Sequence, residues 1–272
     1  MSGRPRIYRT EAIVLRRMNL GEADRLLTVF SPDFGKLRVV AKGVRRPGSR
    51  KAGHLEPFTQ AKLLLARGRE LDIITQAESL DLFPGIQRDL ELLGQAAYMV
   101  ELLDRFTVEE GESRALYLLL IEALGLLGSD APSKALVRYF ELRMLDLVGY
   151  RPELFRCLGC GDEIRPQDQF FSANAGGVLC PACGQGQESV QPISLQALKV
   201  LRHYQRSPLK AALAPSVSSN VHAELEKLML HYLTYQLERD LNAPAFLDRV
   251  RALPRPPFQT HTPSKDTGRT RI

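Results

Sequence analysis

The first 80 residues of the chain alternate short runs of β-branched and aliphatic residues with turn-forming residues. The segments SPDFG (residues 31–35) and RGRE (67–70) have the composition of turns and predict hairpins between neighbouring runs. Five short strands without an intervening helix favour a small barrel of the OB-fold type, with any other small sheet or barrel as the alternative. The predicted strands cover residues 7–18, 24–31, 36–44, 58–66 and 71–79.

From Pro84 onward the apolar residues recur every three or four positions, which predicts helices. One of these segments, residues 113–127, is apolar on nearly all sides and predicts a buried central helix. Gly149 is well suited to the position that follows a helix end. The helical pattern covers residues 86–103, 113–127, 133–148, 193–206 and 220–241.

These patterns predict an α+β, multidomain chain, with an OB-fold β-barrel followed by an α-helical domain in two parts. The stretch between the two parts lacks helical periodicity and is interpreted as an insertion. Beyond Leu253 the sequence is rich in proline, polar and basic, so we expect disorder. The predicted divisions are residues 1–80 (barrel), 81–149 and 191–250 (helical domain), 150–190 (insertion) and 251–272 (disordered basic tail).

Charge is unevenly distributed along the chain, although the formal net charge is only +6. Residues 1–80 hold 16 basic and 8 acidic side chains, a net charge of +8, whereas residues 81–250 hold 16 and 22, a net charge of −6. The last 22 residues return to +4, with five basic residues and one acidic residue. A surface that binds a polyanion is therefore expected in the N-terminal third, with the tail as a secondary candidate.

Seven basic residues and no acidic residue lie between Phe34 and Leu55. A phosphate backbone is the natural partner of such a run, whereas a solvated surface charge is the alternative interpretation of any single member. Aromatic residues are few in this run, which predicts weak sequence preference. The seven residues are Lys36, Arg38, Lys42, Arg45, Arg46, Arg50 and Lys51.

All the cysteines of the chain fall in two C-x₂-C pairs separated by 19 residues. This spacing is typical of a zinc ribbon, in which two tight knuckles direct four thiolates at one Zn²⁺. Two disulfides and an iron–sulfur cluster are the alternatives, disfavoured by the expected cytosolic location and by the spacing respectively. With four protein ligands no position stays open for catalysis, so we predict one structural zinc ion per chain. The predicted ligands are Cys157, Cys160, Cys180 and Cys183, and the glycines expected to give the knuckles conformational freedom are Gly159, Gly161 and Gly184.

The sequence contains no recognisable catalytic constellation. The segment from Gly43 to Arg50 has two glycines at the spacing of a phosphate-binding loop, but the following Lys-Ser/Thr is missing. The five histidines share no ligand or dyad spacing, and the acidic residues form no metal-carboxylate cluster. No apolar run is long enough for a membrane span or a secretory signal. We therefore expect a cytoplasmic protein that is not an enzyme.

Three segments of the chain resemble the N-terminal signature of the RecO family of bacterial DNA repair and recombination mediators. They are EADRLLTVFSPDFGK (residues 22–36), AKGVRR (41–46) and LEPF (55–58). The order of basic barrel, helical body, four-cysteine ribbon and further helices also resembles that family. The resemblance covers approximately residues 6–245.

The resemblance implies an OB-fold followed by a helical domain that bears a zinc-binding insertion. It also implies binding of single- and double-stranded DNA, annealing of complementary strands, and action with RecR to help RecA replace single-strand-binding protein (SSB). The zinc ligands carry over to the four cysteines, and the DNA-contacting run carries over to Lys36, Arg38, Lys42, Arg45 and Arg46. Arg50 and Lys51 follow the family signature and are added from charge alone.

Two classes of protein are the alternatives to a repair mediator. A transcription-associated zinc-ribbon factor would also be basic, but it would bind RNA polymerase. A metal-dependent nuclease would need clustered carboxylates. A direct DNA contact by the ribbon is a further option, because Arg151, Arg156 and Arg165 flank it.

Overall fold

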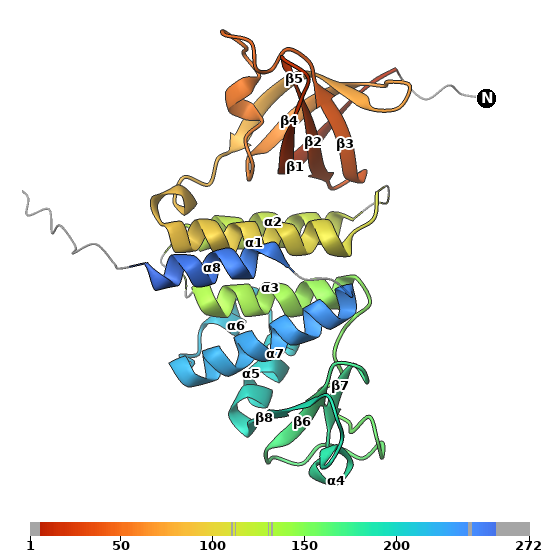
Figure 1. Cartoon of the computed structure of the whole chain (residues 1–272), viewed down its shortest axis with the longest axis vertical. Coiled ribbons are helices and arrows are strands. Elements are labelled where there is room, and N and C mark those ends of the chain that lie inside the picture. Colours follow the sequence, from red (N-terminus) through yellow and green to blue (C-terminus); the bar gives the residue numbers. More distant parts are fainter. Residues whose placement is uncertain are drawn as a thin grey trace, which may run out of the picture.

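The computed structural model describes residues 6–109, 111, 113–129, 131, 133–238 and 241–253. A β-barrel, a helical body and a small ribbon follow one another along the long axis of the molecule (Figure 1). The predicted tail lies outside the described residues from residue 254 onward, whereas Arg251 and Ala252 belong to the last helix. Within the described part of the chain, no helix combines the length and apolar character needed to cross a membrane.

The N-terminal strands form a closed barrel in the order β1-β2-β3-β5-β4. Neighbouring strands are antiparallel except β3 and β5, which pair in parallel. This five-stranded closed arrangement confirms the predicted OB-fold type of barrel. The strands are β1 (Ile7–Leu20), β2 (Asp24–Ser31), β3 (Gly35–Ala41), β4 (Gln60–Ala66) and β5 (Asp72–Asp81).

The middle of β1 is buried on both of its faces, which explains the uninterrupted apolar run at residues 12–15. Ala12 and Val14 belong to the core inside the barrel. Ile13 and Leu15 point the other way and join the core of the helical body, together with Phe30 of β2. Because successive side chains of a strand face opposite sides, one strand contributes to two cores.

The helical body begins after the short 3₁₀ turn η2 (Ile86–Arg88). Asp89 caps the first helix, because its Oδ1 atom accepts hydrogen bonds from the backbone N–H groups of Glu91 (2.6 Å) and Leu92 (3.3 Å). Gly149 has a φ of +87° after the third helix and allows Tyr150 N to donate to Leu145 O (2.8 Å), as predicted for a helix end. The helices are α1 (Leu90–Phe106), α2 (Arg114–Leu127), α3 (Ser133–Leu147), α5 (Leu195–Arg206), α6 (Leu209–Leu213), α7 (Ser219–Leu237) and α8 (Asn242–Ala252).

The predicted helix over residues 220–241 corresponds to α7, which ends earlier, at Leu237. The helix α8, which begins at Asn242, was not predicted. The carboxylate of Glu101, in α1, accepts hydrogen bonds from the backbone N–H groups of Asn242 and Ala243 and so caps α8. Gly94 allows α8 to approach α1 closely, since a Cβ atom at this position would lie 2.5 Å from Leu247 Cδ2. The start of α8 is therefore fixed by a residue distant in sequence.

The insertion forms a three-stranded sheet in the order β7-β6-β8, at the end of the molecule opposite the barrel (Figure 1). The predicted ribbon hairpin corresponds to β6 (Gln169–Ser172) and β7 (Gly177–Leu179), whereas β8 (Val190–Ile193) was not predicted. The ribbon packs on α7, where the rings of Phe171 and Tyr232 meet edge to face with their centroids 5.3 Å apart.

Candidate metal centre and nucleic-acid interface

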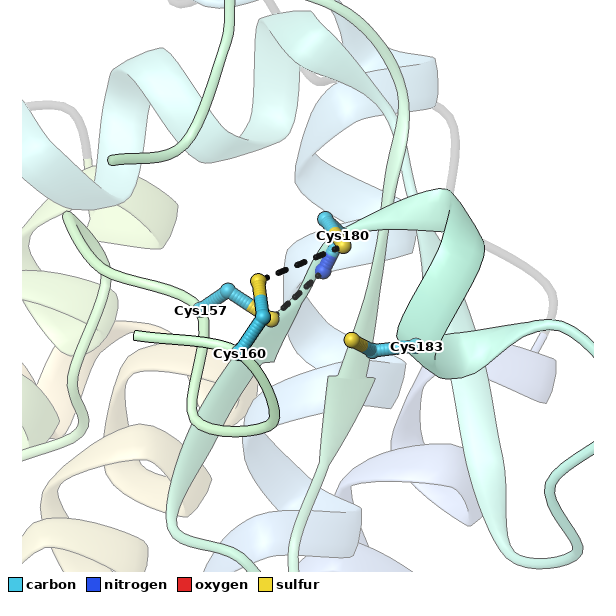
Figure 2. Close-up of side chains that lie close together, drawn as sticks. All are labelled: Cys157, Cys160, Cys180 and Cys183. Atoms are coloured by element: carbon cyan, nitrogen blue, oxygen red, sulfur yellow. Dashed lines mark hydrogen bonds between the residues drawn. The ribbon is translucent and has the colours of Figure 1, made fainter. Parts of the chain in front are cut away.

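The four cysteines predicted as metal ligands come together at the end of the ribbon (Figure 2). Cys157 and Cys160 lie on a turn before β6, whereas Cys180 is the N-cap of the short helix α4 (Pro181–Gly184) and Cys183 lies within it. Their Sγ atoms all lie within 4.8 Å of one another, and those of Cys160 and Cys180 are 4.0 Å apart. Four sulfurs bound tetrahedrally at about 2.3 Å from one ion would be about 3.8 Å apart. The cluster therefore fits one tetrahedral metal ion.

The glycines of the two knuckles have different tasks. Gly161 has a φ of +82°, which turns the chain back so that its N–H donates to Cys157 O (2.8 Å). Gly159 is needed for space instead, because a Cβ atom there would lie 2.9 Å from both Cβ and Sγ of Cys183. Gly184 likewise packs against the ring of Phe170. Conformational freedom, predicted for all three glycines, is thus used at Gly161.

Backbone hydrogen bonds make the thiol of Cys157 more acidic than an ordinary cysteine. Burial alone would raise its pKa, but backbone N–H groups, including those of Gly159 (3.4 Å) and Cys180 (3.2 Å), direct hydrogen bonds at its sulfur and lower the pKa to about 6. The pKa of Cys183 is raised to about 12, first by its hydrogen bond with the Cys180 thiol. The protein dipoles therefore favour the thiolate at Cys157 and not at Cys183, and a bound cation would favour the thiolate form of its ligands.

The predicted DNA-binding residues divide into two groups, one that follows β3 and one within it. Residues 42–54, which we call the basic loop, follow the strand and contain Lys42, Arg45, Arg46, Arg50 and Lys51. Lys36 lies near its start and Arg38 at its middle. Because a strand of seven residues spans about 20 Å, closeness in sequence does not place the two groups on one surface.

The basic loop is held firmly against the barrel. Val44 is buried in the barrel core, Arg45 N donates to Ala23 O (2.9 Å), and Gly43 N donates to Asp24 Oδ1 (2.7 Å). Lys51 Nζ donates to the backbone oxygens of Lys42 (3.1 Å) and Ile74 (3.0 Å). These contacts fix the loop, and backbone oxygens of the protein take two of the three N–H donors of the Lys51 ammonium.

The remaining cations of the basic loop are exposed. Among the described residues, none of them takes part in an ion pair. Arg45 Nη1 donates to Gly21 O in the turn between β1 and β2 (3.0 Å), which orients its guanidinium. The loop therefore presents an ordered group of uncompensated positive charges to solvent: Lys42, Arg45, Arg46 and Arg50.

The structure places Lys36 inside the junction between the barrel and α1, in contrast to its predicted role. Its side chain is only 11% exposed, and its Nζ atom donates to Asp104 O (2.5 Å), Asp104 Oδ1 (3.2 Å) and Thr107 O (2.5 Å). Arg38 is exposed but faces Glu109 at 3.8 Å. Three acceptors satisfy the Lys36 ammonium completely, so it connects the barrel to the helical body and is not free for a phosphate.

Sequence reasoning did not identify three arginines on the neighbouring strands. Arg17 and Arg25 both pair with the carboxylate of Glu56, so their charges are compensated. Arg16 is exposed and joins none of the ion pairs of the described residues. Arg16 lies outside the basic run in the sequence, and its strand β1 lies beside β2 only in the folded barrel, so the charge pattern gave no reason to single it out.

A buried polar cluster beneath a cavity of about 310 Å³ was also missed. Glu141 in α3 is fully buried, and its Oε1 atom accepts hydrogen bonds from Tyr98 OH (2.6 Å) and Arg138 Nη2 (2.7 Å). Burial raises the pKa of Glu141 to about 7, against the lowering effect of Arg138. The only sequence signal was the spacing of Arg138 and Glu141, which lie three positions apart among the apolar residues of α3.

We expect the folded state to become less stable as pH rises from about 4.5 to about 7. The raised pKa means that the native Glu141 keeps a proton that the unfolded chain releases, so its contribution is complete below pH 4.5 and is lost by about pH 7. Denaturant unfolding at several pH values measures this, with a slope of up to about 1.4 kcal/mol per pH unit from this group. In Glu141→Gln, the contribution of this carboxyl group to the pH dependence of the unfolding free energy should vanish. A pH dependence identical to that of the wild type would show that Glu141 does not have a raised pKa.

A closed five-stranded barrel, a helical body and an inserted four-cysteine cluster define a multidomain barrel-and-ribbon protein. Comparison with known families is in agreement with this architecture. The family model described as "Recombination protein O N terminal" matches residues 1–83, and "Recombination protein O C terminal" matches residues 87–245. The chain therefore belongs to the RecO family of DNA repair and recombination proteins.

Curated relatives extend over nearly the whole chain. The "DNA repair protein RecO" of Roseiflexus sp. (strain RS-1) is 44% identical over 250 residues, which cover 92% of this chain and 88% of the relative. The protein of the same name from Pelotomaculum thermopropionicum is 38% identical over 250 residues, 92% of this chain and 96% of the relative. That of Desulforudis audaxviator is 39% identical over 244 residues, 89% and 97% of the two chains. The family membership assigns the chain a role in DNA repair.

Proposed function

We propose that the protein is a recombination mediator that binds single- and double-stranded DNA and anneals complementary strands. With RecR, it would help load RecA onto single strands coated with SSB, in the cytoplasm and at the nucleoid. The observation that supports DNA binding is the basic loop, whose exposed cations have no carboxylate partner within the described residues and whose backbone is fixed before any ligand arrives. A phosphate backbone supplies the missing negative charges.

The proposed mechanism of annealing is electrostatic. Each DNA strand repels the other because both carry a phosphate at every nucleotide, and this repulsion opposes their pairing. Lys42, Arg45, Arg46 and Arg50 neutralise part of that charge and raise the local concentration of strands, so base pairing itself drives the reaction. No step in this mechanism consumes a nucleotide or needs a catalytic residue, which agrees with a mediator role.

We further propose that the four-cysteine cluster holds one Zn²⁺. Thiolate ligands favour zinc over magnesium or calcium, and four sulfurs within 4.8 Å match its tetrahedral preference. The ion would be structural, because Cys157, Cys160, Cys180 and Cys183 together complete its coordination. Its task is then to hold the two knuckles of the ribbon together.

Annealing of SSB-coated strands tests the proposed function. Complementary oligonucleotides are coated with the organism's own SSB and mixed with and without the protein, with no ATP present, and duplex formation is followed by fluorescence. We expect faster annealing with the protein. DNA binding without faster annealing would contradict the mediator proposal and would favour a zinc-ribbon adaptor, for which RNA polymerase pull-down is the next experiment.

A further inference from the structure

Two arginines of α5 share one aromatic ring at the base of the ribbon. The guanidinium carbon of Arg206 lies 3.8 Å from the centroid of the Phe155 ring, and that of Arg202 lies 4.9 Å from it. Phe155 precedes the first cysteine knuckle by two residues, and its backbone is held by Glu153 and Ile164. The ring is therefore a fixed platform for both guanidinium groups.

The charges of this pair are not compensated within the described residues. Neither Arg202 nor Arg206 joins an ion pair there, although the two positive groups lie against the same ring. Arg202 Nε donates to Leu154 O (2.8 Å), and within the described residues its terminal nitrogens have no hydrogen-bond acceptor. Burial first, and then the charge of Arg206, lower the pKa of Arg202. Two like charges held this close favour an anion that contacts both.

The surroundings of the pair extend the positive surface along α5. Lys199, Arg202 and Arg206 recur at intervals of three and four residues, so they lie on one face of the helix, and both Lys199 and Arg206 are exposed. Arg156 is exposed beside Phe155. Glu153 and Glu163 are the nearby acidic groups that act on Arg202, but the Glu153 carboxylate already accepts the N–H groups of Phe155 and Arg156.

We propose that Arg202 and Arg206, presented by Phe155, form a phosphodiester-binding site for a second DNA strand. A guanidinium stacked on a ring is already oriented, and its planar fork of N–H donors matches phosphate oxygens. The site lies on the ribbon side of the helical body, whereas the barrel lies on the opposite side (Figure 1). One molecule would thus hold two strands at once. This inference rests on the proposed binding of DNA by the barrel.

A bridging assay tests the second site. Biotinylated oligo(dT) on beads captures a fluorescent oligo(dT) only when protein holds both, since the two strands cannot pair. We expect Arg202→Gln/Arg206→Gln to lower capture at least tenfold and to flatten the salt dependence of single-strand binding by up to about 1.4 log–log units. Arg88→Gln/Arg249→Gln, which removes two exposed cations of the helical body, is the matched control and should behave like the wild type.

Two further variants separate this inference from a folding defect and from the proposed function. Arg206→Glu changes an exposed residue and should abolish bridging, while the thermal midpoint should fall by only about 2–4 °C, because the stack on Phe155 is lost and an acidic side chain enters the last turn of α5. Bridging at the wild-type level by both Arg202→Gln/Arg206→Gln and Arg206→Glu would show that the second site is wrong. The barrel site would still stand if Arg45→Ala/Arg46→Ala weakens DNA binding. If the wild-type protein binds no DNA, the proposed function itself is wrong.

Discussion

Replacement of Cys160 by serine is expected to release the metal and to unfold residues 150–190. Cys160 is exposed, so the substitution removes almost no packing and acts through the loss of one ligand. Structural zinc sites in small domains bind with apparent free energies of about 10 kcal/mol or more, and this free energy is part of the folding free energy. Chelation of the wild-type protein should reproduce the effect.

Three measurements check this result. Elemental mass spectrometry should find one zinc ion per wild-type chain and less in Cys160→Ser, amide hydrogen exchange should lose protection across the ribbon, and the thermal midpoint should fall. Gln187→Ser, at another exposed ribbon position, is the matched control and should retain the metal. A wild-type protein without stoichiometric metal, or a Cys160→Ser variant with a fully protected ribbon, would rule out the structural zinc site.

The barrel should survive this loss. Its interior core is separate from the core to which the ribbon contributes Phe171 and Val178. Affinity for an oligonucleotide of about ten nucleotides, a length that one OB-fold binds, should therefore stay within about twofold of the wild type. Substitution of the buried Cys157 would disturb packing as well as metal binding. Cys160 is exposed and is therefore the more informative position for this test.

The second large effect is expected at the basic loop. Arg45→Ala/Arg46→Ala should weaken duplex binding regardless of sequence and should flatten the plot of log K against log salt concentration by up to about 1.8 units. At 0.1 M salt this corresponds to a loss of about 60-fold in affinity. Both side chains are exposed, so little stability should be lost. Fluorescence anisotropy at several salt concentrations provides the measurement.

A control with the same change in net charge makes this test specific. Lys62→Ala/Arg69→Ala removes two exposed cations elsewhere on the barrel, and Lys62 stands between Glu11 and Glu78 on the neighbouring strands. This variant should keep the wild-type slope. An unchanged slope in Arg45→Ala/Arg46→Ala would remove the basic loop from the DNA contact surface. Equal flattening in both variants would show that only the overall charge matters.

Local sequence signals predicted the elements whose determinants are themselves local. The turn at residues 31–35 places Gly35 at a φ of +63°, and the two C-x₂-C pairs bring their thiols together, as the spacing predicted. The strands are recognisable because their β-branched runs end at turn residues. For the turns and strands the physical cause lies within a few residues of the element, and for the two cysteine pairs it lies within one short ribbon.

Contacts between distant segments explain what the sequence did not predict. Lys36 belonged to a basic run, yet Asp104 and Thr107 of another domain determine its role. Glu101 likewise caps α8 across 141 positions of the chain. The charge count could not distinguish Lys36 from the exposed cations of the basic loop, because burial and hydrogen-bond partners are determined only when the barrel docks on α1.

Double-sided burial of β1 affects how the protein can be dissected. Ile13, Leu15 and Phe30 point out of the barrel and are covered by the helical body. A fragment cut after β5 would expose all three to water as one apolar area, and a fragment of this kind tends to self-associate. The barrel is therefore not an independent module, and studies of its DNA binding call for point substitutions in the intact chain.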